Sequence, residues 1–167
     1  MELIVKNKFI SWGGSSTVTT SDGKPAYQVK GKVFSITKKK WICDMEGNKL
    51  FLVRNKYWKL FKNKALIYDN EKNLVCMLVN NLFTIKKAFT VEKCASEIEI
   101  TNQKISLGYN WPIIKDGKEI GSIGCDFKFV RIVDEFKINV IDESEAPFLI
   151  ALAIALDNIR DDKRDND

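Results

Sequence analysis

Histidine is absent from this sequence of 167 residues, and proline is scarce, with three residues. Without histidine the chain lacks the commonest general base and the commonest ligand of transition metals. No two of its four cysteines form a CxxC pair, which excludes zinc-ribbon and thioredoxin-type sites; they are Cys43, Cys76, Cys94 and Cys125. We expect them to be small buried apolar residues, and we predict no metal, no cofactor and no enzymatic activity.

A long hydrophobic run is also missing. The longest apolar stretch, Ala146–Leu156, has eleven residues, and as a helix it would span about 16 Å, against about 30 Å for the apolar core of a bilayer. The first residues lack the pattern of a signal peptide. We therefore expect a cytoplasmic protein without a transmembrane segment. An alternative, in which this stretch leaves the domain and inserts into a membrane, is disfavoured by its length and by the lack of a basic flank before it.

The charge is distributed unevenly along the chain. The net charge is +5 overall, but residues 1–93 hold 18 Lys and Arg against 7 Asp and Glu, a net charge of +11. Residues 94–167 hold 9 against 15, a net charge of −6. A basic half can attract partners that carry phosphate, and it can equally be a solvated surface that the acidic half balances after folding.

A weak repeat of β-hairpins runs along most of the chain. Each copy has an apolar strand, a turn with an acidic residue and then another strand, and the turn residues are Asp22, Asp44, Asp69 and Asp116. Aspartate stabilises turns by bonding to its own backbone, and the EF-hand spacing of a calcium site is absent, so these acids indicate turns. Successive short hairpins predict an antiparallel meander.

The apolar stretch at 146–156 fixes how this meander must be arranged. A helix without a polar face has to be buried on all sides, and a closed barrel around it achieves this without leaving sheet edges. Eight strands enclose too little space, so we predict about twelve, within a range of eleven to thirteen. Ser144 is expected to cap the helix, and Gly108, Gly121 and Gly124 are expected at bulges or where the wall approaches it. Residues 1–160 would form one domain, followed by a frayed polar tail at 161–167.

These features together resemble a known family. The turn repeats, the strand Asp134–Val140 and the alanine-rich segment Phe148–Asp157 are similar to the LURP-one-related family, in the group that includes tubby C-terminal domains and phospholipid scramblases. The resemblance implies a twelve-stranded barrel around a central C-terminal helix. It implies no catalytic residues, and for related domains it points to phosphoinositides and phospholipids.

The function predicted from these observations is that of a non-enzymatic binding or scaffold module, cytoplasmic or peripheral at the membrane. Lysines that alternate along strands would form outer stripes that bind anionic lipid headgroups or other phosphorylated partners: Lys6, Lys8, Lys30, Lys32, Lys38, Lys39 and Lys40. Nucleic acid is disfavoured, because no recognised binding motif is present. The alternative is a structural or protein-interaction barrel without a small ligand, which predicts an exposed apolar patch.

Overall fold

A computed structural model of the chain describes residues 1–6, 15–31, 37–56, 64–80, 89–101, 103–105, 108–126 and 135–164. The described elements are β1 (Glu2–Lys6), β2 (Ser15–Thr20), β3 (Pro25–Gly31), β4 (Lys40–Cys43), β5 (Lys49–Asn55), β6 (Lys64–Asp69), β7 (Leu74–Asn80), β8 (Phe89–Glu92), β9 (Ile98–Ile100), β10 (Gln103–Ile105), β11 (Gly108–Lys115), β12 (Lys118–Asp126), β13 (Glu135–Val140), the short 3-10 helix η3 (Glu143–Glu145) and α1 (Ala146–Arg164).

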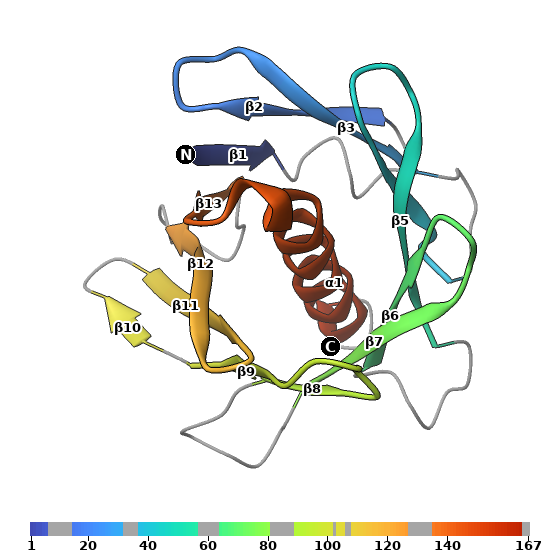
Figure 1. Cartoon of the computed structure of the whole chain (residues 1–167), viewed down its shortest axis with the longest axis vertical. Helices are drawn as coiled ribbons and strands as arrows, with labels where there is room; N and C mark the ends of the chain where they lie inside the picture. Colours follow the sequence, from blue (N-terminus) through green and yellow to red (C-terminus); the bar gives the residue numbers. More distant parts are fainter. Residues whose placement is uncertain are drawn as a thin grey trace.

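The strands form one antiparallel sheet that curls around α1 (Figure 1). Pairing follows the order β10-β11-β12-β13-β1-β2-β3-β4-β5-β6-β7-β8, and β9 also pairs with β11, so β9 and β10 share one of twelve positions. The chain joins the sheet into a ring where β1 pairs with β13, from Glu2 opposite Asn139 to Lys6 opposite Glu135. The predicted barrel of about twelve strands around a C-terminal helix is confirmed. It differs from full closure at one place, because β8 and β9 form no ladder with each other among the described residues.

The core is the space between the sheet and α1. Along each strand alternate side chains face inward, as in Leu3 and Val5 of β1 or Phe136 and Ile138 of β13, and all four are fully buried. On α1 every side chain from Ala146 to Ile159 is buried except that of Pro147, which is half-buried. The helix therefore lies inside the barrel. No helix in the described ranges has the length and apolarity needed to cross a bilayer.

Both ends of the helix differ from the sequence prediction. Helix α1 is preceded by η3, and the cap is Asp142, whose Oδ1 accepts hydrogen bonds from the backbone N (3.1 Å) and Oγ (2.6 Å) of Ser144. The extra 3-10 turn moves the capping position two residues upstream of the expected Ser144. At its other end α1 continues to Arg164, so the segment expected to be a tail from residue 161 begins within the helix.

Two of the hairpin turns share one hydrogen-bonding pattern. In the β4–β5 turn, Asp44 Oδ1 accepts from the backbone N of Asn48 at 2.8 Å, and in the β6–β7 turn Asp69 Oδ1 accepts from that of Asn73 at 2.8 Å. The fourth residue of the first turn is Gly47, with φ +92°, whereas the second turn has Lys72 there, with φ +71°. A left-handed conformation suits glycine and is strained for lysine.

This difference predicts that Lys72→Gly stabilises the protein. Relief of the left-handed strain gains about 1–2 kcal/mol, and the greater freedom of glycine in the unfolded chain costs about 0.5–1 kcal/mol. We expect the free energy of unfolding, measured by urea denaturation, to rise by about 0.5–1 kcal/mol as the net of these two terms. Lys72→Ala is the control, because it removes the same charge but keeps the strain. Equal stability of the two variants would contradict this explanation.

At Gly121 the barrel wall lies against the helix. A Cβ at this position in β12 would lie 2.3 Å from the backbone oxygen of Asn139 in β13 and 2.8 Å from Leu149 Cδ1 in α1. The adjacent ladder contains a bulge, because Ile113 is opposite Gly121 while Ile114 is opposite Glu119. Both features agree with the expectation for this glycine.

Candidate anionic-ligand surface

The two ends of the barrel differ in the kind of connection they carry. In an antiparallel meander every second connection lies at the same end, and here the short hairpin turns and the link to α1 share one end, which we call the turn end. They are residues 21–24, 44–48, 70–73, 93–97, 116–117 and 141–145. The opposite end, which we call the loop end, holds the last residue of β1, β3 and β5 and the first residue of β4 and β6.

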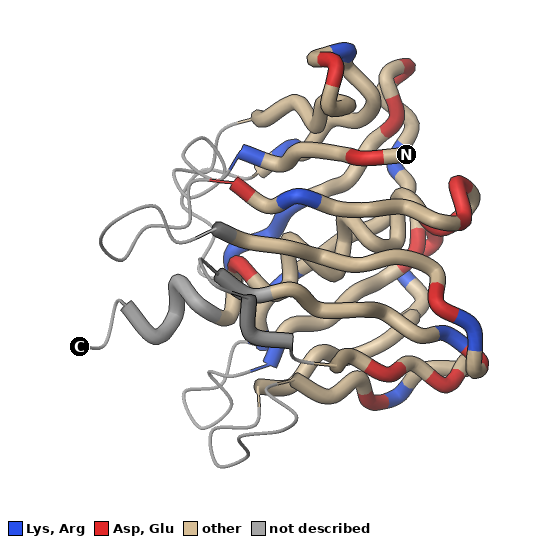
Figure 2. Tube along the Cα trace, turned by 90° about the vertical axis from the view of Figure 1, so that its left-hand side faces the viewer, with Lys and Arg blue, Asp and Glu red and all other residues tan. Residues whose placement is uncertain are grey.

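The turn end is acidic. Each of its connections contains at least one Asp or Glu, and Figure 2 shows these residues concentrated on the side away from the loop end. Hydrogen bonds within the turns stabilise the negative charge of two of these carboxylates. The hydrogen bond from Asn48 lowers the pKa of Asp44, and that from Asn73 lowers the pKa of Asp69. These hydrogen bonds therefore favour the charged form of both carboxylates.

Basic residues lie at the loop end, and the structure brings some of the predicted lysines together there. Lys6, at the end of β1, is exposed, and Lys38 and Lys39 immediately precede β4. Two further lysines that the sequence analysis did not single out lie at the same end, namely Lys56 after β5 and Lys64 at the start of β6. We call these five residues the basic rim. Alternation within a strand does not predict the last two, because only the topology places the end of β5 and the start of β6 at the same end of the barrel as the start of β4.

The other predicted lysines lie elsewhere. Lys30 belongs to β3, but its side chain points toward the turn end, where its Nζ would be 3.6 Å from a Cβ on Gly47. Lys40 is inside the barrel, with 4 % of its surface exposed. Lys8 and Lys32 lie outside the described residues. The strand pattern does indicate that Lys40 faces inward, because residues 40 and 42 lie on the same face of the strand and Ile42 faces the core.

Lys40 forms a buried ion pair with the helix. Its Nζ lies 3.4 Å from Oδ2 of Asp157, and each of the two side chains is only 5 % exposed. Asp157 is not the last residue of the helix, because α1 continues to Arg164. Beside the pair, Asn55 Nδ2 donates to the backbone oxygen of Asn158 at 3.2 Å, and Asn158 Nδ2 donates to that of Lys38 at 3.1 Å. These contacts fix the depth of the helix in the barrel, immediately below the basic rim.

Three of the four cysteines are buried, as the sequence predicts. Cys43, Cys76 and Cys125 are buried, and Cys94 is half-buried in the turn between β8 and β9. Burial raises the pKa of the Cys76 thiol to about 12, with a further contribution from the neighbouring Cys94. Burial therefore favours the neutral thiol at this position. Within the described ranges, no three Cys, Asp or Glu side chains are grouped as a metal site would require.

The loop end therefore carries the ammonium groups of the basic rim, of which Lys64 is ion-paired with Glu92 at 3.9 Å and Lys6 is opposite Glu135 in the sheet. The turn end carries charge of the opposite sign. Comparison with known proteins adds the family. No curated protein and no solved structure matches the chain. The family model described as LURP-one-related matches residues 1–157, which include every strand of the barrel and the buried part of the helix up to the ion-paired Asp157. The chain therefore belongs to the LURP-one-related family.

Proposed function

We propose that this barrel is a non-enzymatic, cytoplasmic binding module whose basic rim recognises anionic headgroups at a membrane surface. The observation that carries the proposal is the separation of charge along the barrel axis, with acidic turns at one end and the basic rim at the other. Such a charge distribution orients the molecule in the field of an anionic surface, with the rim facing the surface and the acidic turns facing away.

Two further observations support this proposal. The interior of the barrel is occupied by α1, whose side chains from Leu149 to Leu156 are fully buried, so binding chemistry belongs to the outside. The resemblance to tubby-like domains and scramblases also favours a phospholipid or another phosphorylated partner.

Vesicle binding tests the proposal. We expect the protein to sediment with vesicles that contain phosphatidylserine and not with phosphatidylcholine vesicles, and to bind less as the salt concentration rises from low to physiological. The triple variant Lys6→Gln/Lys39→Gln/Lys56→Gln should weaken binding on the order of 100-fold, because each lysine near an anionic surface contributes about 1 kcal/mol.

The matched control is Lys24→Gln/Lys72→Gln/Lys118→Gln, which removes the same charge from the turn end. It should bind almost as well as the unmodified protein. Negligible and equal binding to both kinds of vesicle, or equal losses in the two triple variants, would show that the basic rim is not a membrane-binding surface.

A second candidate function is a structural or protein-interaction barrel without a small ligand. Among the described residues, the exposed large apolar side chains all belong to the turn end: Met1, Met45, Leu74 and Ile141. Their common location favours a protein contact at that end, away from the basic rim. The two functions are distinguished by which end a partner protects from solvent.

A further inference from the structure

Two of the four thiols lie next to each other at the end of the β7–β8 ladder. Met77 of β7 is opposite Glu92, the last residue of β8, so Cys76 is level with the residues that follow β8 in the chain. Cys94 is the second of these residues, and its side chain packs against the buried core cluster to which Cys76 belongs. A hydrogen bond joins the two side chains.

The backbone at the end of β8 allows this arrangement. Lys93 has φ +56°, a left-handed conformation that is unusual for a residue with a side chain. This residue ends the extended strand, and the following Cys94 lies outside both β8 and β9. A turn residue shifts its backbone more readily than a residue held in a ladder. Cys94 can therefore move closer to Cys76 without loss of strand pairing.

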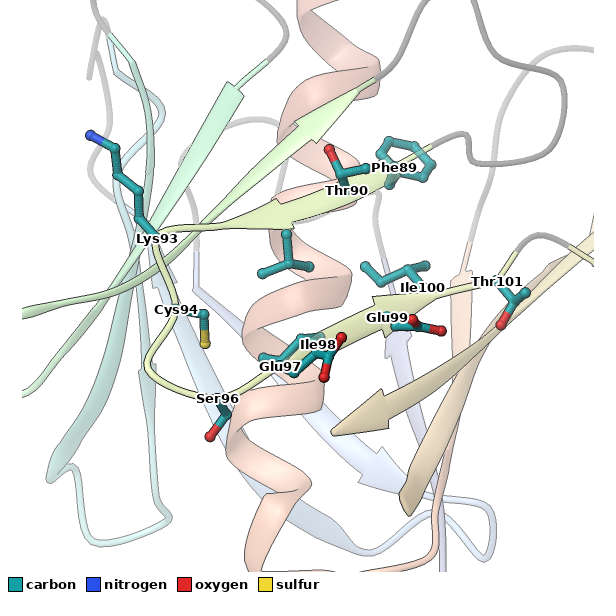
Figure 3. Close-up of a pocket in the computed structure, with 11 residues that line it drawn as sticks. Phe89, Thr90, Lys93, Cys94, Ser96, Glu97, Ile98, Glu99, Ile100 and Thr101 are labelled. Atoms are coloured by element: carbon teal, nitrogen blue, oxygen red, sulfur yellow. The ribbon is translucent and has the colours of Figure 1, made fainter. Parts of the chain in front are cut away.

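The two thiols differ in their access to solvent. Cys76 is fully buried, whereas Cys94 is half-buried and lines a cavity of about 390 Å³ beside the turn that joins β8 to β9 (Figure 3). The cavity is large enough for a small oxidant, since one water molecule takes up about 30 Å³ in the liquid. Cysteines that sense oxidants are accessible and often lie next to a second cysteine that reacts with the oxidised form. Cys94 has the position of the first and Cys76 that of the second.

We propose that Cys76 and Cys94 are an oxidisable pair, which hydrogen peroxide converts into a disulfide between β7 and the β8–β9 turn. In the first step Cys94 Sγ attacks one oxygen of the peroxide and the O–O bond breaks, which yields a sulfenic acid and water. Cys76 Sγ then attacks Cys94 Sγ and the S–O bond breaks. The leaving hydroxide takes up the proton of the Cys76 thiol. Two thiols are oxidised, and one peroxide is reduced to two waters.

The disulfide would act at the one place where the described barrel wall has no ladder. Here β8 pairs with β7, and β9 pairs with β11. The start of β9 is already held on its far side, because the backbone N of Asp116 donates to the oxygen of Glu97 at 2.8 Å and the backbone N of Glu97 donates to Asp116 Oδ1 at 2.9 Å. A covalent bond to β7 would hold the same turn from its other side.

Oxidation would therefore stabilise the barrel reversibly. A disulfide restricts the unfolded chain, and in cytoplasmic proteins disulfides are usually transient and redox-sensing. This inference does not depend on the proposed membrane function.

Counting thiols after peroxide treatment tests this inference. The whole protein is treated with hydrogen peroxide, the reaction is stopped with catalase, and the remaining thiols are alkylated in denaturant. We expect two of the four thiols to disappear together, about tenfold or more faster than those of Cys43 and Cys125, and to return with dithiothreitol. Mass spectrometry should find the peptides of Cys76 and Cys94 linked. Oxidation of Cys94 without a crosslink, a crosslink between two molecules, or equal rates for all four thiols would overturn the proposal.

Variants assign the roles of the two thiols. Cys76→Ala should leave Cys94 as a sulfenic acid that dimedone traps, whereas Cys94→Ser should keep Cys76 reduced. The matched control Cys43→Ala/Cys125→Ala removes two buried thiols and should form the crosslink at an unchanged rate. Urea denaturation gives a second measurement, because peroxide should raise the midpoint of the unmodified protein and not that of Cys94→Ser. Loss of the Cys76 thiol from Cys94→Ser at the unmodified rate would overturn the assignment.

Discussion

Removal of the Asp157 carboxylate, as in Asp157→Ala, is expected to lower the free energy of unfolding by about 3–5 kcal/mol. The reason is the surroundings of its partner. The ammonium of Lys40 lies 3.4 Å away, and the two side chains are each only 5 % exposed, so the variant leaves a positive charge in the barrel interior. Urea denaturation at pH 7 measures this loss.

Two controls separate this mechanism from a general effect of substitution. Lys24→Ala removes half of an ion pair that is largely exposed, 2.7 Å from Asp22, and should cost less than about 1 kcal/mol. The double variant Lys40→Met/Asp157→Leu replaces both charges by apolar groups and should recover most of the stability, because no charge then remains buried. A double variant as unstable as Asp157→Ala would show that packing, and not the unpaired charge, causes the loss.

The second large effect is expected for Gly121→Ala, which should destabilise the barrel by about 3 kcal/mol. The added methyl group would lie 2.3 Å from the backbone oxygen of Asn139, and only movement of β13 relative to β12 can relieve this contact. Denaturation with urea again gives the magnitude. Truncation of the neighbouring helix side chain in Gly121→Ala/Leu149→Ala should not restore stability, since the closest clash is with backbone.

Gly23→Ala is the matched control for this substitution. Gly23 has φ +84°, and a Cβ there would have nothing within 4 Å, so the only cost is the conformational strain of about 1 kcal/mol. Equal losses at the two positions would contradict the steric explanation for Gly121.

The sequence predicts the architecture because one segment constrains the rest. Residues 146–156 are apolar all round, and a helix of this kind must be enclosed by whatever the remaining chain forms. The hairpin turns at Asp44 and Asp69 establish a meander, and a meander around a helix leads to a barrel. The strand count follows from the space that the helix needs, so these predictions depend on local patterns and on geometry.

Other features depend on contacts between distant segments and were not predictable in the same way. The ion pair of Lys40 joins residues 117 positions apart in the sequence. The pattern around Trp41 places Lys40 on the inward face, yet it does not show which acid meets it. Likewise, β8 and β9 flank a short turn, yet among the described residues they form no ladder with each other, and no local pattern predicts this.

The candidate surface was predictable only in part for a similar reason. Lys6, Lys38 and Lys39 form part of the basic rim because each ends or precedes a strand at the same end of the barrel. Lys56 and Lys64 lie at the same end because of the order in which the strands pair. The sequence alone does not specify this order. The buried Lys40 shows that an uninterrupted run of lysines can cross from the outside of a barrel wall to its inside.

The pairing of β1 with β13 has a consequence for how this protein is made. On the ribosome, β1 emerges first, and its partner strand and the helix that fills the barrel follow only after every other strand has been synthesised. Until then the early hairpins have neither a core nor a closed edge, and such unpaired edges are prone to aggregation. Contacts between residues so far apart in sequence also slow the final closure. Nascent chains that stop before residue 135 should accordingly need chaperones, because they lack both the strand that pairs with β1 and the helix that fills the barrel.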